Sequence, residues 1–574
     1  MTERSPHQEE RNLRPNVRIG LLCNSAEIAA WQAECIRNVQ SLPFTEIVVL
    51  TVDATPTSPP DSLWARLRRK LSNGLLFWRM YERCVLENIP ANKRVSLPED
   101  IANLPTVQCV PLKVGKYRQR FDDASVRALR EYDVDVLLRF GFGILTGEIL
   151  TLPKYGLWSF HHGDPEHYRG APPGFWEIHN KEPVTGVVLQ RLTEKLDGGI
   201  VLHSGWFKTN IASYPRSLNR TLMGSAHFVA RALIDLRRDP SALVDRPCVA
   251  LCGQIYRYPR TIAVFEMLMV SVRARVFELC RSLFSHQQWA IGFVQKTPEK
   301  LLEEAGEAAT PIQGVSWLPE PAGRFLADPF AVDGDSGVIL AEEFDWKTGR
   351  GHIASIRSDI SDPIDSRSAV REDFHLSYPY TFEHQGEIYC VPESAENNEV
   401  ALYILNQSTG TWVKHKSLLS GCAVLDPTIF SHEGRWWLFC TKSGAGANEA
   451  LYAWHAEDPL GDWHPHTANP LKVDVRSARP AGRPFVHDGH LIRPAQDCST
   501  GYGNGICFNR ITRITTDEFA ENFAGLLLPE TGTYGRGLHT ICAAGPRSIV
   551  DGARSVFIGA EFCRVLRKKF GGSV

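Results

Sequence analysis

A short pattern recurs about every fifty residues through the second half of the chain, the length of one four-stranded propeller blade. Each copy opens a strand with a polar or proline-containing turn and continues within about ten residues to a glycine turn and a second apolar strand. The repeat therefore predicts an all-β five-bladed propeller over residues 286–574, with Gln288–Phe293 as the strand that closes the ring. The copies open at Ala327-Asp-Pro-Phe330, Ser377-Tyr-Pro-Tyr380, Leu425-Asp-Pro-Thr428, Gly482-Arg-Pro-Phe485 and, more weakly, Gly537-Leu-His-Thr540, where Asp551-Gly552 is expected to close the turn.

The first half of the chain has a different pattern, in which apolar runs alternate with helical spacing. Val17–Cys23 and Glu46–Thr51 are short apolar runs typical of buried parallel strands. This β-α-β opening predicts a Rossmann-like α/β domain over residues 16–260. Prolines and a basic stretch interrupt the pattern, so we expect an insertion at about 52–105. Residues 1–15 are polar and charged and are expected to form a disordered tail.

Two segments have the spacing of amphipathic helices. Residues 62–80 combine Leu and Trp at helical spacing with a basic cluster, so they could lie on an anionic membrane surface or simply pack on the sheet with the arginines in water. Residues 261–285 repeat apolar side chains at intervals of three and four and predict a linker helix. We expect this helix to bury its stripe against one domain, with peripheral membrane contact as the alternative. The stripe consists of Ile262, Phe265, Met269, Val272, Val276, Leu279 and Leu283.

Composition and charge exclude several classes of protein. The chain has 574 residues, too many for a single core, and its formal net charge of -2 gives no overall field that would draw it to nucleic acid. Its 14 cysteines show no zinc-site spacing, and we expect no metal site. The sequence shows neither the apolar segment of a signal peptide nor an apolar run long enough to span a membrane. These features predict a multidomain cytoplasmic protein with reduced thiols, at most peripheral to a membrane.

Three motifs in the first half lie at defined spacings. They are Ser159-Phe-His161, Tyr168-Arg-Gly-Ala-Pro-Pro173 and Leu196-Asp-Gly-Gly-Ile200, and Arg139-Phe-Gly-Phe-Gly-Ile144 precedes them. Ser159 and His161 are two residues apart, so on a strand they face the same side. The carboxyl end of such a strand opens into the crevice where α/β proteins bind ligands. A distant aspartate such as Asp197 can hydrogen-bond the imidazole and hold its charged form.

These motifs, in this order, resemble the folate-dependent formyltransferases over residues 17–260. The resemblance implies that His161 is the catalytic histidine and that Asp197 orients it and handles the proton. Ser159 stands where that family has an asparagine that polarises the formyl oxygen. Arg169 and Gly170 would form a turn and a wall of the substrate pocket. The implied folate-binding segment consists of Arg139, Phe140, Gly141, Phe142, Gly143 and Ile144.

The chemistry of formyl transfer suits these residue types. An amine attacks the formyl carbon, negative charge develops on the formyl oxygen and the amine loses a proton, so the site needs a hydrogen-bond donor and a proton acceptor. The resemblance implies 10-formyltetrahydrofolate as the formyl donor. Neither a small C-terminal barrel nor a basic surface for tRNA is evident in the sequence. The expected acceptor is therefore an amino sugar, as a nucleotide sugar or a glycolipid intermediate.

The repeat predicts a second site, because residues that open the innermost strands of propeller blades line one funnel. This half resembles the five-bladed propellers of glycoside hydrolases and one half of the plant glucosamine inositolphosphorylceramide transferases, which implies a glycan ligand. Two carboxylates could flank a glycosidic bond, so glycan processing beside a non-catalytic first domain is the alternative to glycan binding. A non-enzymatic glycan or lipid-surface adaptor is a further alternative. The predicted funnel residues are Asp328, Tyr378, Glu393, Asp426, Arg483 and His539.

Overall fold

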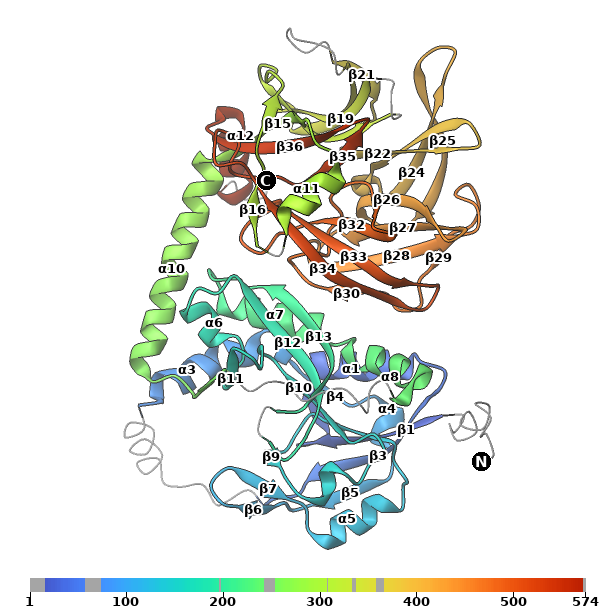
Figure 1. Cartoon of the computed structure of the whole chain (residues 1–574). Helices are drawn as coiled ribbons and strands as arrows, with labels where there is room; N and C mark the ends of the chain where they lie inside the picture. Colours follow the sequence, from blue (N-terminus) through green and yellow to red (C-terminus); the bar gives the residue numbers. More distant parts are fainter. Residues whose placement is uncertain are drawn as a thin grey trace, which may run out of the picture. The chain divides into compact units, whose positions relative to one another are not determined.

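Figure 1 shows the computed structural model of the chain, which describes residues 16–56, 74–195, 198–241, 253–306, 308–332, 337–357 and 366–570. Residues 1–15, most of the segment 62–80 and Asp197 lie outside the described residues. The chain divides into two compact units, Met1–Ala274 and Arg275–Val574, and each is described by itself.

The described part of the first unit is built on a seven-stranded sheet of order β13-β12-β10-β8-β1-β3-β5. From β10 to β5 neighbouring strands are parallel, whereas β12 and β13 are antiparallel to their neighbours. The two apolar runs that open the chain form β1 and part of β3, and β1 is buried almost throughout, as its continuous apolar sequence requires. The strands are β1 Val17–Cys23, β3 Thr45–Asp53, β5 Thr106–Cys109, β8 Val136–Arg139, β10 Leu157–His161, β12 Val184–Arg191 and β13 Ile200–Lys208.

Helices pack on this sheet and complete an α/β unit, as the sequence predicts (Figure 1). Helix α5, Asp123–Arg130, buries Leu129 in a cluster with Leu137 and Leu157 of the sheet. A second cluster joins Trp31 of α1, Ala30–Gln40, to side chains of α3 and α7. The remaining helices are α3 Leu76–Cys84, α4 Glu99–Ala102, α6 Phe175–His179, α7 Tyr214–Gly224, α8 Phe228–Arg238, and the short η3 Leu86–Asn88, η4 Pro90–Asn92 and η5 Glu148–Leu150. Three small sheets pair β2 Glu27–Ala29 with β4 Arg94–Ser96, β11 Tyr168–Gly170 with β14 Gln254–Tyr256, and β7 Arg118–Arg120 with β6 Leu112–Val114 and β9 Ile144–Leu145.

The described part of the second unit is largely β, as the repeat predicts, and consists of five mostly antiparallel sheets. The segment 288–293 lies in β15, which pairs along its whole length with β36, so strands from both ends of this unit share one sheet. The first sheet contains β17 Val315–Trp317, β15 His286–Val294, β36 Arg547–Val556 and β35 Ile541–Ala544, and the second contains β18 Arg324–Ala331, β19 Val338–Asp345, β20 Arg350–Arg357 and β21 Arg367–Val370. The third contains β22 Ser377–His384, β23 Glu387–Glu393, β24 Glu399–Asn406 and β25 Thr411–Ser420, and the fourth contains β26 Val424–His432, β27 Arg435–Lys442, β28 Ala450–Ala456, β29 His464–Pro465 and β30 Lys472–Val473. The fifth contains β16 Thr310–Pro311, β34 Phe519–Leu528, β33 Ile506–Ile514, β32 His490–Gln496 and β31 Phe485–His487.

Each of these five sheets shares a hydrophobic cluster with at least two others. A sheet that is apolar on both faces must be covered on both, and packing between sheets meets that requirement. Five pairs of residues illustrate this, each pair joining two sheets within one cluster. The pairs are Trp289 with Phe325, Leu340 with Cys390, Leu402 with Leu438, Phe439 with Leu491, and Phe508 with Val550. Two helices, α11 Pro298–Ala305 and α12 Gly559–Phe570, and the short η6 Ala395–Asn397 accompany the sheets.

The linker segment forms one helix, α10, Thr261–Phe284, and the division between the units falls within it. Its buried residues are Val264, Met267 and Ser271. The predicted stripe lies elsewhere on the helix, because Ile262, Phe265, Met269, Val272 and Val276 are all exposed. The helix α10 is apolar on more than one side, and the side that is buried within the first unit is not the predicted stripe.

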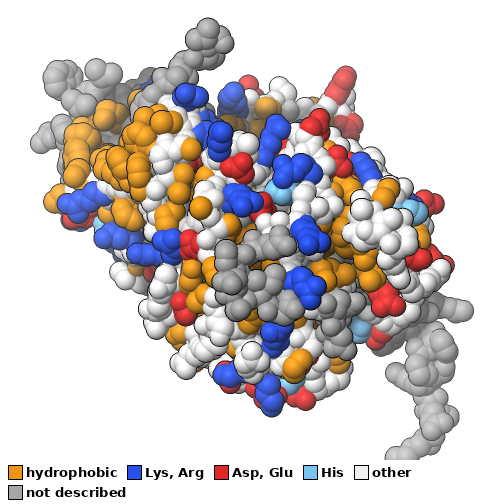
Figure 2. Space-filling model, turned by 90° about the horizontal axis from the view of Figure 1, so that it is seen from above, with side chains coloured by type: hydrophobic (Ala, Val, Ile, Leu, Met, Phe, Trp, Pro, Cys, Tyr) orange, Lys and Arg blue, Asp and Glu red, His pale blue; other side chains and the backbone are white. Residues whose placement is uncertain are grey.

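The charge distribution agrees with the near-neutral composition. On the face seen in Figure 2, Lys and Arg side chains lie among acidic and apolar ones. Among the described residues, none of the helices is long and apolar enough to cross a membrane.

Candidate functional site

A pocket of about 260 Å³ lies at the carboxyl ends of β8 and β10 in the first unit. This is the edge where parallel α/β sheets bind ligands. Four of the residues predicted from the sequence line it, namely Arg139, Ile144, His161 and Gly170. Its remaining lining residues are Leu145, Phe160, His162, Pro173, Gln190, Leu192, Thr193 and Lys195.

Ser159 does not line this pocket. Its side chain is 1% exposed, and its hydroxyl accepts a hydrogen bond from Arg139 Nε at 3.0 Å and donates one to the Phe160 carbonyl at 3.3 Å. Arg139 in turn donates from Nη1 to the Gly143 carbonyl at 2.7 Å. Ser159 therefore holds Arg139, and Arg139 holds the loop that follows β8.

The predicted folate-binding segment is fixed by contacts with the loop after β1. Phe142 has φ 64°, in the left-handed region, and its backbone N–H donates to Asn24 Oδ1 at 2.7 Å. A Cβ at Gly141 would lie 2.5 Å from the Asn24 backbone nitrogen, so the close approach requires glycine. Phe140 packs beside Trp31, and its carbonyl accepts a hydrogen bond from Gln32 Nε2.

His161 is the last residue of β10, and its orientation is set by the turn that follows. Nε2 lies 2.9 Å from the Tyr168 carbonyl oxygen. A carbonyl can only accept a hydrogen bond, so Nε2 carries the proton in the neutral ring and Nδ1 is the basic nitrogen. The neighbouring His162 is buried, and burial lowers its pKa to about 3, which makes it a poor proton carrier near neutral pH.

Arg169 and Gly170 lie on β11. Gly170 has φ 93°, and a Cβ there would come within 2.1 Å of the Tyr256 carbonyl, so only glycine fits this wall of the pocket. Asp197 lies shortly after a bend at Glu194 and Lys195, but it is itself outside the described residues.

A second pocket, of about 610 Å³, adjoins the first, and Pro173 lines both. Its wall combines large aromatic rings with amides, three glutamates and a single arginine. Phe140, Pro172 and Pro173 of the predicted motifs line this pocket, but sequence reasoning did not predict it, because most of its other residues come from the loop after β1, α1, the insertion and α7. Its lining includes Asn24, Glu27, Trp31, Gln32, Trp78, Glu82, Glu87, Asn88, Asn92, Arg94, Tyr214 and Tyr258.

In the second unit, three repeat copies have the same backbone conformation within their strands, β18, β22 and β26. Asp328, Tyr378 and Asp426 have φ of 51°, 45° and 51°, each before a proline and each beside a shift in strand register. In the fourth copy the left-handed residue is Gly482, with φ 129°, rather than Arg483. The repeat therefore reflects a bulge that aims the side chain at the start of the strand.

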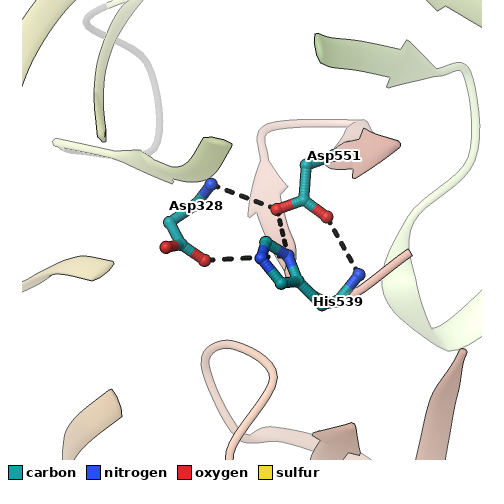
Figure 3. A group of neighbouring side chains, drawn as sticks. All are labelled: Asp328, His539 and Asp551. Carbon is teal, nitrogen blue, oxygen red and sulfur yellow. Dashed lines mark hydrogen bonds and ion pairs between the residues drawn. The ribbon is translucent and has the colours of Figure 1, made fainter. Parts of the chain in front are cut away.

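Asp328 and His539 come together with Asp551, as Figure 3 shows. His539 Nδ1 lies 2.5 Å from Asp551 Oδ2 and 3.8 Å from Asp328 Oδ1. Burial opposes charge on His539, but the two carboxylates outweigh it and raise its pKa. Burial raises the pKa of Asp328 to about 6. Asp551 lies inside β36, so the turn expected at this position is wrong.

Asp551 acts as a bridge between backbone segments. It accepts hydrogen bonds from the N–H groups of His539 at 2.9 Å, Thr540 at 3.0 Å and Asp328 at 3.1 Å. Among the described residues, the side chains of Asp328, His539 and Asp551 lie close enough together to share a metal ion. Because both Asp551 oxygens already accept backbone hydrogen bonds, this set is satisfied as a hydrogen-bonded cluster.

Asp426 and Glu393 both form ion pairs with Arg479, a buried residue that sequence reasoning missed. Arg479 donates from Nη1 to Asn448 Oδ1 at 3.0 Å, and its guanidinium carbon lies 5.0 Å from the centre of the Tyr502 ring. Glu393 Oε2 accepts the Asp426 backbone N–H at 3.2 Å and lies 3.7 Å from Arg479 Nη2. Burial, followed by the charge of Asp426, raises the pKa of Glu393 well above its usual range.

Glu342 is a further buried carboxylate of this region. Burial, and then the charges of Asp328, Glu393, Asp426 and Asp551, raise its pKa well above the usual range. Five strands, β18, β19, β23, β26 and β36, thus bring acidic side chains together in one largely buried cluster. A pair of adjacent acidic residues within an apolar strand, Glu342 and Glu343, was the available sequence signal.

The other two predicted funnel residues bridge sheets. The Tyr378 hydroxyl pairs with Thr428 Oγ1 at 3.0 Å and accepts the Gly482 N–H at 2.8 Å. Arg483 Nη2 donates to the Thr381 carbonyl at 2.6 Å. Arg479, four residues earlier in the chain, is the arginine that reaches the carboxylates.

Comparison with known families connects the second unit to plant transferases. The sequence model of one family, described as "Glucosamine inositolphosphorylceramide transferase 1, N-terminal", matches residues 313–534. Glucosamine inositolphosphorylceramide transferase 1 of Arabidopsis thaliana is 37% identical over 211 residues, 34% of this chain and 27% of the relative. The protein of that name from Oryza sativa subsp. japonica is 32% identical over 260 residues, 41% of this chain and 34% of the relative. The chain therefore spans about a third or less of the length of these relatives.

Formyltransferases form a second group of relatives. Methionyl-tRNA formyltransferase of Prochlorococcus marinus is 35% identical over 95 residues, 16% of this chain and 28% of the relative. Among solved structures, a family 117 glycoside hydrolase of Zobellia galactanivorans is 11% identical with a TM-score of 0.32, covering 47% of this chain and 91% of its own. Phosphoribosylglycinamide formyltransferase of Bacillus halodurans is 16% identical with a TM-score of 0.26. The match covers 40% of this chain and 100% of the formyltransferase chain.

Proposed function

We propose that the first unit transfers a formyl group from 10-formyltetrahydrofolate to the amine of an amino sugar, and that the second unit is a five-bladed propeller that binds the glycan part of the substrate. The observation that carries this proposal is the pair of adjoining pockets, the smaller at the carboxyl end of β10 with His161 in its wall and the larger beside it, with Pro173 lining both. Transfer between two ligands needs two such pockets side by side. The identity with a methionyl-tRNA formyltransferase supports the same reaction class.

The smaller pocket suits the folate. Leu145 and Leu192 give it apolar walls, and the buried Oε1 of Gln190 has no hydrogen-bond partner within the described part of the chain. Such a lining, apolar with a few polar groups, is typical of sites for flat heteroaromatic ligands. Arg139–Leu145 and Gln190–Lys195 would hold the folate, which when bound supplies the formyl group.

His161 is the proposed proton acceptor. His161 lines the smaller pocket, and its imidazole takes the proton that the amine must lose. Asp197 remains the proposed partner that orients His161, on the strength of the motif alone. These roles need no metal.

The larger pocket suits a polyhydroxyl amine. Its aromatic rings can stack on a sugar ring, and its amides can hydrogen-bond hydroxyl groups. Glu27, Glu82 and Glu87 outnumber Arg94 among its charged groups, which favours an ammonium group over a phosphate. This lining supports an amino sugar as the acceptor.

Glycan processing in the second unit is the second candidate, because buried carboxylates gather there. Burial raises the pKa of Glu342 well above its usual range and that of Asp328 to about 6, and Asp426 forms an ion pair with Arg479. Unequal carboxylates are what an acid and a base on a glycosidic bond require. The similarity to proteins named glucosamine inositolphosphorylceramide transferase supports a glycan ligand here.

The direct test incubates the full-length protein with 10-formyltetrahydrofolate and a panel of amino sugars, free and as nucleotide sugars, with mass spectrometry of the products. A new N-formyl sugar is expected, and replacing His161 by Ala should abolish it. Release or transfer of a sugar without any formylated product would favour the second candidate. Absence of both turnover and folate binding would overturn the proposed function.

A further inference from the structure

The Ser159 hydroxyl is in the wrong place to hydrogen-bond a ligand in the smaller pocket. It is buried within the sheet, it already accepts from Arg139 and donates to the Phe160 carbonyl, and the residues that line the pocket do not include it. A hydroxyl has one proton to donate, and this one is used. If formyl transfer occurs here, another group must hydrogen-bond the formyl oxygen.

Gln190 lies directly across the sheet from Ser159. Strands β10 and β12 are antiparallel, with Ser159 opposite Gln190 and His161 opposite Val188. Directly opposed residues share a face of the sheet, and residues two apart on one strand do so as well. The Gln190 side chain is therefore on the same face as His161, and both line the pocket.

The oxygen of the Gln190 amide has no hydrogen-bond partner among the described residues. The residue is 3% exposed, and Oε1 is buried. Burying an unpaired amide oxygen is costly, so an apolar side chain would suit this position better unless a ligand pairs with the amide. Because Oε1 is the buried end of the amide, the N–H₂ group is the end that can donate into the pocket.

Space for this side chain depends on a glycine of the third motif. A Cβ at Gly199 would lie 2.8 Å from Gln190 Oε1 and 2.6 Å from the Arg191 carbonyl oxygen. The bare backbone of Gly199 thus gives the Gln190 amide room in the pocket, and the glycine pair after Asp197 has a role in shaping the site.

We propose that the Gln190 amide donates the hydrogen bond to the formyl oxygen, in the role that the sequence motif assigns to residue 159. The inference rests on the proposed formyl transfer in the same pocket. In that reaction the acceptor nitrogen bonds to the formyl carbon as the bond from that carbon to folate N10 breaks. His161 takes the proton from the acceptor nitrogen and returns it to N10, and the Gln190 N–H stabilises the charge that develops on the oxygen.

Binding measurements without an acceptor test this role apart from turnover. The affinities of the full-length protein for 10-formyltetrahydrofolate and for tetrahydrofolate are compared by calorimetry, in the wild type and in Gln190→Met and Gln190→Glu. Both variants keep the side-chain length and remove the N–H₂ donor. Gln254→Met, on an exposed strand of the same unit, is the matched control.

We expect both Gln190 variants to lose about five- to tenfold in affinity for the formylated folate and less than twofold for tetrahydrofolate, the effect of one lost hydrogen bond. The rate of formyl transfer should fall by about 10²–10³, the usual effect of losing one such donor. Equal losses for both folates, or none, would overturn the role of Gln190. If the wild type binds neither folate, the proposed function itself fails. Thermal unfolding confirms that each variant is folded, and Gln190→Glu decides the matter if Gln190→Met is not.

Discussion

Arg479 donates two parallel hydrogen bonds to Asp426, from Nε to Oδ2 at 2.6 Å and from Nη2 to Oδ1 at 3.1 Å. Both side chains are buried, and Gln496 Nε2 donates a third bond to the same carboxylate at 2.8 Å. This forked contact joins the segment before β31 to the start of β26, and it pairs one carboxylate of the acidic cluster with a buried cation.

Replacing Arg479 by Met should therefore destabilise the protein strongly. The change leaves Asp426 buried without its cation, which typically costs about 3–5 kcal/mol. The measurement is the free energy of unfolding by denaturant, followed in the second unit. Arg513→Met, which removes the exposed partner of Glu518, is the control and should cost less than about 1 kcal/mol. Equal losses for the two variants would contradict a buried ion pair at Asp426.

A buried glutamate predicts a dependence of stability on pH. Glu177 on α6 is buried, its Oε1 has no hydrogen-bond partner among the described residues, and burial raises its pKa from 4.5 to about 7. The folded state therefore holds a proton that the unfolded state releases, so stability from this group falls as pH rises from about 4.5 to 7 and is constant above. The loss amounts to about 3 kcal/mol.

The variant Glu177→Gln should remove that dependence. Its unfolding free energy should exceed that of the wild type at pH 8 and approach it near pH 4.5, because the amide imitates the protonated acid. Denaturant unfolding at several pH values measures the difference. A constant difference between the two proteins across this range would show that Glu177 keeps an ordinary pKa.

The wall at Gly170 should not tolerate a side chain. A methyl group there would meet the Tyr256 carbonyl, and φ at this residue is in the left-handed region. Gly170→Ala should lower stability by about 2–4 kcal/mol and weaken folate binding, as judged by thermal unfolding and calorimetry. Gly115→Ala, with φ 64° but open space around it, should cost about 1 kcal/mol and leave binding intact. Similar behaviour of the two variants would mean that the contact at Tyr256 does not shape the pocket.

The second unit offers a test that separates its role from that of the first. Asp328→Asn should weaken binding of the chain to an array of immobilised glycans about tenfold, while formyl transfer to a free amino sugar persists. Loss of formyl transfer with unchanged glycan binding would contradict the division of labour between the units.

Local patterns predicted much of the secondary structure. The apolar runs predicted β1 and β3, and the fifty-residue repeat predicted the largely β second unit, in which Asp328, Tyr378 and Asp426 share a left-handed conformation. The missed residues depend on contacts between distant segments. Gln190 meets Ser159 only through the antiparallel register of β10 and β12, and no spacing within one segment reveals that pairing.

The same reason explains the errors in the second unit. Asp551 looked like a turn residue because it precedes a glycine, but its carboxylate is fixed by three N–H groups from two other segments. Arg483 shares its position in the repeat with Asp328, yet the backbone of its copy turns left-handed one residue earlier, at Gly482. On α10, periodicity identified a helix but could not decide which of its apolar sides is buried.

Formyl transfer to an amine is the central claim, and label transfer tests it most directly. Full-length protein is mixed with 10-formyltetrahydrofolate that carries an isotopically labelled formyl carbon and with a panel of amino sugars, beside His161→Asn, which keeps a similar size but removes the basic ring nitrogen. The account predicts labelled N-formyl sugar with the wild type and none above background with His161→Asn. Label that stays on the folate with every amino sugar, or label transfer that His161→Asn does not slow, would contradict it.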